Sequence, residues 1–220
     1  TLPGQGRVVE SPTAFFQAKQ NQPENLAAGV SRLFLGVRLE CAQCHDHPFA
    51  KWQRKDFWQF AAFFHSTAAQ GKFAIPETTE FVKATYLAGE PAQLKKDEFP
   101  VQNLADWLTS RENQFFAQAG VNRLWFHFFG TGLVDPVDDF GDENPASHPE
   151  LLRELAAEFA AHDFNMKFLI RGILASRAYQ LTSRQTDESQ SDPRLFAKMA
   201  IGGMSTDQLF DSLAEATGYF

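Results

Sequence analysis

Residues 113–130, with the sequence NQFFAQAGVNRLWFHFFG, predict a long helix at the centre of an all-helical protein. Apolar side chains recur along it at steps of three and four, the spacing of one buried helix face: Val121, Leu124, Trp125 and Phe128. Gly130 follows this pattern and favours the left-handed backbone conformation that ends many helices. We therefore expect a helix from about Asn113 to Phe129.

The N-terminal part of the chain predicts two more helices. From Glu24 onward, apolar side chains again recur at helical spacing: Leu26, Val30, Leu33, Phe34, Val37, Cys41 and Cys44. We expect one amphipathic helix that carries both cysteines on its apolar face and stops before Pro48. Asp56, with Gln59 three residues later, gives the start signal of the next helix. Its predicted buried stripe consists of Phe57, Phe60, Ala61 and Phe64.

Three start signals predict three helices after residue 146. Ser147 with Glu150 forms a capping box in front of Leu151, Leu152, Leu155 and Phe159. Asn165 is the expected cap of the next helix, whose apolar face we predict from Met166, Ile170, Ile173 and Leu174. Ser205 with Gln208 begins a last helix that ends at Gly218 and buries Leu209, Leu213 and Ala216.

Residues 71–101 predict a linker, because they contain Pro76, Gly89, Pro91 and Pro100 and only one short run, 81–86, that fits a strand. Residues 1–22 show no sustained periodicity and indicate an extended arm. The fold class we predict is all-α, either two small helical domains or one composite helical domain. The expected divisions are a first segment at 1–70, the linker at 71–101 and a helical domain at 102–220.

Composition and charge restrict the kind of protein and the kind of partner that we expect. The chain has 220 residues with 20 basic and 27 acidic side chains, a net charge of −7, and 44% hydrophobic residues, so we expect a folded protein. The absence of clustered Lys and Arg argues against a nucleic-acid partner. The best apolar stretch, 168–175, is short and interrupted by Arg171, so we expect no membrane-spanning helix. The 23 phenylalanines favour core packing over a cofactor pocket.

The motif with the clearest chemistry is Cys41-Ala42-Gln43-Cys44-His45, which spells Cys-x-x-Cys-His and contains the only two cysteines. In c-type haem attachment the two thiols bind the porphyrin and the adjoining imidazole ligates the iron. Zinc is a rival, with His47 as a fourth ligand, although four ligands within seven residues is unusually crowded. A redox dithiol would need a βαβ context, and an iron–sulfur cluster would need more cysteines. We favour haem c over another metal or no cofactor.

A haem bound through His45 leaves the second face of the iron open to another ligand. Our preferred distal ligand is His127, which stands between Phe126 and Phe128. His47 is a weaker candidate, because it lies only two residues from His45. Other candidates are His65, Met166, Met199 and Met204.

The acidic loop at residues 135–144, DPVDDFGDEN, is a second candidate site. Alternating oxygen ligands around a glycine suit calcium, but the loop lacks the twelve-residue EF-hand pattern. Two of its carboxylates could also serve as acid and base in a carbohydrate hydrolase. We favour a solvated turn beside a helix start.

Two segments resemble known domains. Residues 35–64, with LECAQCHDHPF, Trp52 and FAAFF, resemble the planctomycete cytochrome-c-like domain of large secreted multidomain proteins. NRLW at 122–125, GLVDPVDDF at 132–140, HPELL at 148–152 and RAYQL at 177–181 resemble the planctomycete-specific domain that follows it. The resemblance implies a longer parent protein, often with a separate haem domain upstream. It also implies export and a link to the processing of complex polysaccharides.

The ends of the sequence agree with a longer parent. The sequence begins Thr1-Leu2-Pro3 without an initiator Met and ends soon after a predicted helix, so we expect the export signal to lie upstream. The first resembling domain also lacks most of its N-terminal half here. We therefore expect a protein of the periplasm or the cell surface.

The leading functional hypothesis is an exported cytochrome-like module. It would bind haem through Cys41, Cys44 and His45 and pass electrons to a redox partner protein or an upstream haem domain. We expect the haem to be buried among Phe49, Phe57, Trp58 and Phe60. The alternative is a structural or binding module of a cell-surface assembly with a non-haem metal or no cofactor. A hydrolase acting through the acidic loop ranks last, and electron transfer is favoured over enzymatic activity.

Overall fold

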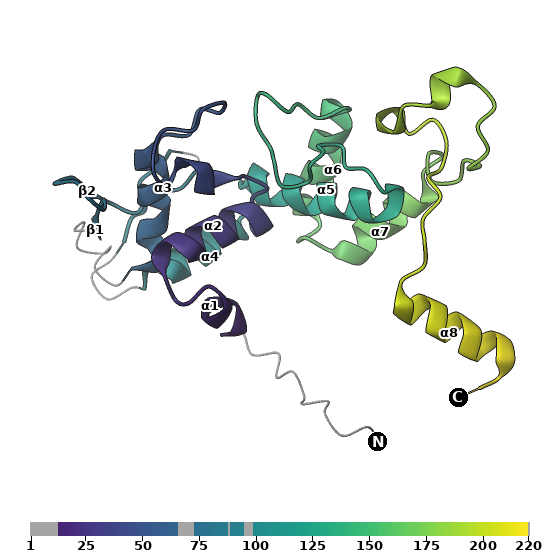
Figure 1. The fold of residues 1–220 in the computed structure, drawn as a ribbon, viewed down its shortest axis with the longest axis horizontal. Helices are drawn as coiled ribbons and strands as arrows, with labels where there is room; N and C mark the ends of the chain where they lie inside the picture. The colour runs from purple at the N-terminus through teal and green to yellow at the C-terminus, as the bar shows by residue number, and fades with distance from the viewer. Residues whose placement is uncertain (1–12, 66–72, 88, 95–98, 220) are drawn as a thin grey trace.

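The computed structural model describes residues 13–65, 73–87, 89–94 and 99–219. Helices dominate this part of the chain, which confirms the helix-rich character predicted from the sequence, and a two-stranded sheet adds to them (Figure 1). The α-helices and strands are α1 (Ala14–Ala18), α2 (Pro23–Phe34), α3 (Arg54–Ala61), β1 (Phe73–Ala74), β2 (Phe81–Val82), α4 (Pro100–Leu108), α5 (Gln114–Phe129), α6 (Pro149–Ala161), α7 (Met166–Ala175) and α8 (Thr206–Thr217). Short 3-10 turns include η1 (Leu39–Ala42), η2 (Ala62–Phe64), η4 (Glu188–Gln190) and η5 (Pro193–Leu195).

The first hydrophobic core lies among α2, α3 and α4. Its largest fully buried side chains come from α3, from the end of α2 and from the turns η1 and η2: Phe57, Phe60, Phe63, Leu35 and Leu39. The predicted stripe of α3 is confirmed for Phe57, Phe60 and Ala61, whereas Phe64 is only partly buried. Burial of these large apolar side chains stabilises the first core.

The segment between α3 and α4 packs into the first core. β1 and β2 pair antiparallel, with Phe73 opposite Val82 and Ala74 opposite Phe81. The side chains that it buries are Phe73, Ile75, Val82, Ala84 and Leu87. The described residues of the predicted linker thus contribute to a core, and the division of the chain at 71 and 101 stays a prediction.

α2 ends before it reaches the cysteines, so the expectation of one continuous helix through Cys41 and Cys44 is wrong. Gly36 takes a left-handed φ of +68°, and the backbone N–H groups of Leu35 and Val37 both donate to the carbonyl of Ser31 at 3.1 Å. This arrangement satisfies a helix-end carbonyl and turns the chain toward η1.

The second core lies among α5, α6 and α7. α5 begins after Asn113, whose side chain accepts a hydrogen bond from Phe116 N at 3.3 Å, and ends at the left-handed Gly130. Both boundaries confirm the sequence prediction. Asn165 caps α7 in the same way, accepting from Phe168 N at 3.1 Å. The buried apolar side chains of this core are Ala117, Val121, Trp125, Phe129, Leu133, Val134, Leu152, Ala156, Phe159, Ala160, Leu169, Ile173 and Phe196.

Two predicted caps are corrected. α3 begins one turn earlier than expected, with Gln53 as the cap and Asp56 as its partner in the capping box. α6 has His148 at the cap position, because the backbone N–H and the hydroxyl of Ser147 both donate to the carbonyl of Leu133, at 2.7 and 3.2 Å. Ser147 therefore fastens the preceding loop to the second core instead of starting a helix.

α8 has the predicted capping box of Ser205 and Gln208 and ends at Gly218, yet it stands apart from both helix groups at the end of an extended segment (Figure 1). Its apolar side chains are consequently exposed, and the predicted burial of Leu209, Leu213 and Ala216 is wrong. Met166 of α7 is likewise exposed, so it does not belong to the buried face predicted for that helix. Among the described residues, no helix has the length and apolar composition to cross a bilayer.

Candidate functional site

The Cys-x-x-Cys-His motif lies on the surface of the first core. Cys41 belongs to η1, and both Cys41 and Cys44 are free and exposed. Leu39 and Ala42 of the same turn are fully buried and anchor it in the core. The turn therefore presents both thiols to solvent from a rigid base.

The imidazole of His45 is exposed and held in one tautomer. Its Nδ1 lies 2.7 Å from the carbonyl oxygen of Asp46. A carbonyl oxygen only accepts, so Nδ1 carries the proton and the neutral ring keeps its lone pair on Nε2. Within the described part of the chain, Nε2 has no hydrogen-bond partner. This is the arrangement of a metal-ligating histidine, whose other ring nitrogen donates to a carbonyl or carboxylate.

His47 has the opposite arrangement. Its Nδ1 accepts hydrogen bonds from Phe49 N at 3.1 Å and from Ala50 N at 2.9 Å. Its backbone N–H donates to the carbonyl of Trp52 at 2.8 Å. Because two N–H groups share the Nδ1 lone pair, the neutral ring carries its proton on Nε2 and offers no free lone pair to a metal. His47 thus stabilises the loop through these hydrogen bonds, and this geometry argues against a role as a metal ligand.

The motif and the loop after it are fastened to α3 by three hydrogen bonds. Asp46 accepts from the backbone N–H of Arg54 at 2.9 Å, at the start of the helix where a carboxylate is favoured. The indole of Trp58 and the guanidinium of Arg54 donate to the carbonyl of Gln43, at 3.0 and 3.4 Å. None of these contacts uses a thiol or Nε2 of His45, so the loop is ordered while its reactive groups stay free.

The aromatic pocket expected around the haem is not assembled in the part of the chain that the structure describes. Phe57 and Phe60 are fully buried in the first core, and Trp58 packs edge-on against Phe57 with ring centroids 5.2 Å apart. Phe49 is 77% exposed. The nearby cleft of about 330 Å³ is lined by Lys51, Trp52, Asp56, Gln59, Thr85, Tyr86, Leu87, Gly89 and Pro91, not by the motif. A group held by the motif would therefore sit on the surface.

His127, the preferred distal ligand of the haem, stays a prediction. His127 is exposed on α5, beside the second core, and its ring meets the Phe128 ring at 81°. Among the described residues, no group of three or more His, Cys, Asp or Glu side chains could hold a metal ion.

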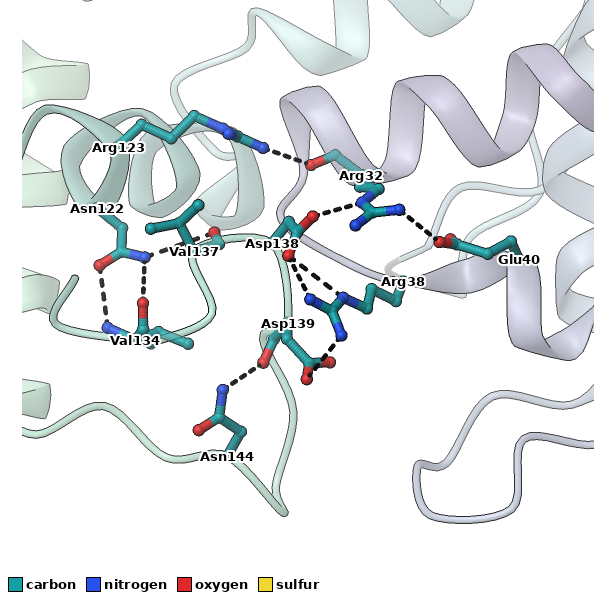
Figure 2. A network of polar contacts seen from close by, with 10 residues as sticks. All are labelled: Arg32, Arg38, Glu40, Asn122, Arg123, Val134, Val137, Asp138, Asp139 and Asn144. Carbon is teal, nitrogen blue, oxygen red and sulfur yellow. Dashed lines mark hydrogen bonds and ion pairs between the residues drawn. The ribbon is translucent and has the colours of Figure 1, made fainter. Parts of the chain in front are cut away.

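The acidic loop between α5 and α6 is a junction between the two cores. Arg32 and Arg38, from the first core's side of the junction, converge on the carboxylate of Asp138 (Figure 2). Arg38 donates to Oδ1 of Asp138 from Nη2 at 2.8 Å and from Nε at 3.2 Å, while Arg32 Nε donates to Oδ2. Asp139 lies 3.6 Å from Arg38 Nη1. The side chain of Asp138 is only 15% exposed, so the prediction of a solvated turn is wrong for this residue.

The two arginines set the ionisation of Asp138. Burial raises the pKa of its carboxyl group, but hydrogen bonds from Arg32 and Arg38 outweigh burial, and the pKa is lowered overall. A carboxylate engaged by two guanidinium groups is a poor calcium ligand and a weak general base. Asp138 is therefore unsuited to the calcium site and to the hydrolase site that were considered for this loop.

Asn122 of α5 fixes the start of the same loop. It is fully buried; its Nδ2 donates to Val134 O at 2.8 Å, and its Oδ1 accepts from Val134 N at 3.0 Å (Figure 2). Farther along, Phe140 N donates to Gly36 O at 2.8 Å, which ties the loop to the end of α2. Arg32, Arg38 and Asn122 were not predicted as site residues, because no local spacing links them to residues 134–139.

Together these features define a helix-rich protein with two hydrophobic cores, an exposed Cys-x-x-Cys-His turn and an arginine–aspartate junction. Residues 102–220, more than half of the chain, match the family model PSD1, "Protein of unknown function (DUF1553)", and the chain belongs to this family. Residues 5–69 match the model PSCyt2, "Protein of unknown function (DUF1549)". Both are planctomycete-type domains, which confirms that part of the resemblance. No curated protein and no solved structure matches the chain.

Proposed function

We propose that Cys41, Cys44 and His45 form a c-type haem attachment site and that the protein transfers electrons. The observation that carries the proposal is the tautomer of His45, in which the Asp46 carbonyl takes Nδ1–H and Nε2 keeps its lone pair beside two free, exposed thiols. This combination provides both the covalent anchors and the axial ligand that haem c needs.

The residues of the turn have separate roles. Cys41 and Cys44 would each add S–H across one vinyl group of the porphyrin, with sulfur bonding to one carbon and hydrogen to the other, so attachment would consume no oxidant. His45 would hold the iron through Nε2, and the carbonyl of Asp46 keeps the ring in the tautomer whose Nε2 lone pair is free. When bound, the haem iron supplies one-electron redox chemistry.

A surface site suits exchange of electrons with another protein. Because Phe57 and Phe60 are fully buried in the first core, a haem held by the turn would lie on the surface of the protein. A haem at the surface would be accessible to a partner, and solvent exposure is one of the factors that set the reduction potential. The partner is a redox protein or an upstream haem domain, and the location is the periplasm or the cell surface, where c-type haem is assembled.

Reduction followed by visible spectroscopy tests the proposal. The chain produced together with a haem c maturation system is expected to show sharp absorption bands that change reversibly on one-electron reduction. The variant His45→Ala retains both thiols and is expected to keep the haem but change its ligand-sensitive bands. A colourless wild-type chain would end the proposal.

The second candidate is a structural or binding module of a cell-surface assembly, with a non-haem metal or no cofactor. The junction of Arg32 and Arg38 with Asp138 favours it, because these ion pairs tie the two cores together. A wild-type chain that gains neither haem nor metal under maturation conditions, yet stays folded, would support this candidate.

A further inference from the structure

Arg32 connects the acidic loop to the motif turn. Its guanidinium donates to Asp138 Oδ2 and lies 3.3 Å from Oε1 of Glu40 (Figure 2). Glu40 belongs to η1 and directly precedes Cys41. Within the described part of the chain, Oε2 of Glu40 is buried without a hydrogen-bond partner, so Arg32 is the cation that compensates this carboxylate.

Arg38 provides the second connection. It occupies the position before η1, and both of its contacts to Asp138 end on Oδ1. The motif turn is thus held at its start by Arg38 and at its second residue by Glu40, and both connections meet on the carboxylate of Asp138. Two ion pairs to the partly buried carboxylate of Asp138 hold the motif turn in one orientation more strongly than a single exposed ion pair would.

Close packing reinforces the junction. The carbonyl of Gly36 accepts from Phe140 N at 2.8 Å, two residues after Asp138. A Cβ atom at Gly36 would lie only 2.5 Å from the Phe140 ring, so the backbone of the α2 end and the loop meet without space for a side chain. The loop therefore cannot shift relative to the motif turn without losing these contacts.

We propose that Asp138 is a positioning residue for the haem-attachment turn. The acidic loop of the PSD1 region acts as a clamp on Leu39–Ala42 and fixes the direction in which Cys41 leaves the first core. The role of this clamp in haem attachment rests on the proposed function. Its effect on the stability of the turn Leu39–Ala42 does not. The segment GLVDPVDDF, which the haem site itself does not use, thereby acquires a role.

Hydrogen exchange on the full chain without haem tests the clamp. The amide of Gln43 donates to the carbonyl of Glu40 at 3.1 Å, so its exchange rate reports opening of the motif turn. In Asp138→Asn, which keeps the side-chain volume and loses the charge, exchange at Gln43 is expected to be about tenfold faster. The control Asp142→Asn changes an exposed carboxylate of the same loop and is expected to leave Gln43 unchanged.

Two further variants distinguish a local effect on the motif turn from general unfolding of the chain. Arg38→Lys keeps the charge but loses the two-nitrogen contact, and it is expected to accelerate exchange at Gln43 to a smaller degree. Asp138→Glu restores the charge and is expected to recover part of the protection. Unchanged exchange at Gln43 in Asp138→Asn, with faster exchange only inside residues 131–146, would overturn the inference.

The haem-loaded protein separates this inference from the proposed function. The reduction potential of Asp138→Asn is expected to differ from that of Asp142→Asn, because the direction of the turn sets the environment of the iron. If the wild-type chain binds no haem but Gln43 responds as expected, the proposed function fails and the clamp stands. If haem binds while both Gln43 and the potential are unaffected by Asp138→Asn, the clamp fails alone.

Discussion

Arg38 donates two hydrogen bonds to one carboxylate oxygen of Asp138, a residue 100 positions farther along the chain. This contact joins the region that resembles a cytochrome-c-like domain to the region that defines the PSD1 family. The acidic segment is thus an internal docking element, and the side chain of Asp138 within it is only 15% exposed.

Loss of the Asp138 charge should destabilise the protein in a pH-dependent manner. At pH 7 we expect Asp138→Asn to lower the free energy of unfolding by about 1–2 kcal/mol, a value reduced by solvent screening at the half-exposed Arg32. The pKa of Asp138 is lowered in the folded state, so the contribution is complete above the ordinary aspartate range. It is lost as the pH falls through the lowered pKa.

Urea titrations of wild type and Asp138→Asn between pH 7 and pH 3 measure this effect. The difference between the two proteins should be constant near neutrality and shrink below pH about 4. A difference that grew on acidification would contradict the assigned ion pair. Asp142→Asn, which removes an exposed carboxylate, serves as the control.

Gly36 should tolerate no side chain. We expect Gly36→Ala to cost about 2–4 kcal/mol, because alanine is strained at a φ of +68° and its Cβ would meet the Phe140 ring. Gly172 of α7 is the matched control, since a Cβ there meets nothing within 4 Å.

Thermal and urea unfolding measure both glycine variants. Gly172→Ala should be neutral or stabilising by up to about 1 kcal/mol, as expected for a glycine inside a helix. Equal losses in the two variants would mean that the close contact between Gly36 and Phe140 is absent in solution.

Asn122 should be essential for the start of the acidic loop. Replacement by Leu preserves the approximate volume but leaves the N–H and C=O of Val134 buried without their partners. The expected loss is about 2–4 kcal/mol. Chemical denaturation measures it, with Asn144→Ala, which removes one partly buried contact to Asp139 O, expected to cost less. A neutral Asn122→Leu variant would refute the buried amide contact.

Local signals carried most of the fold prediction. The helix start near Asn113, the cap at Asn165 and the left-handed Gly130 depend on a few neighbouring residues, and the structure has each of them where the sequence places it. The end of α2 was missed because apolar spacing continues through Val37, whereas the left-handed Gly36 stops the helix. The burial of side chains on α8 was also missed, because an amphipathic pattern does not reveal whether a partner surface is present.

The candidate site, too, could be predicted from the sequence only in part. The motif at Cys41–His45 is visible in five residues, but its surface position depends on α3 filling the core with Phe57 and Phe60. The contacts of Asp138 were beyond sequence reasoning, because they depend on how the two cores come together. Arginines are common on helix ends, and no sequence pattern near Arg32 or Arg38 indicates an ion pair with the acidic loop.

The second axial ligand remains a prediction that spectroscopy can test. If His127 ligates the iron, His127→Ala should change the absorption and magnetic spectra of the low-spin iron, because an axial nitrogen ligand is lost. The replacement is at an exposed position, so the stability of the chain should not change by more than about 0.5 kcal/mol. An unchanged spectrum would remove His127 from the candidates.

The most direct test of the central claim is the intact mass of the denatured chain after production with a haem c maturation system. A thioether bond survives denaturation, so we predict a mass increased by one haem, and we predict that Cys41→Ala combined with Cys44→Ala abolishes the increase. An unmodified mass with two free thiols in the wild-type chain would contradict the assignment of this turn as a haem site.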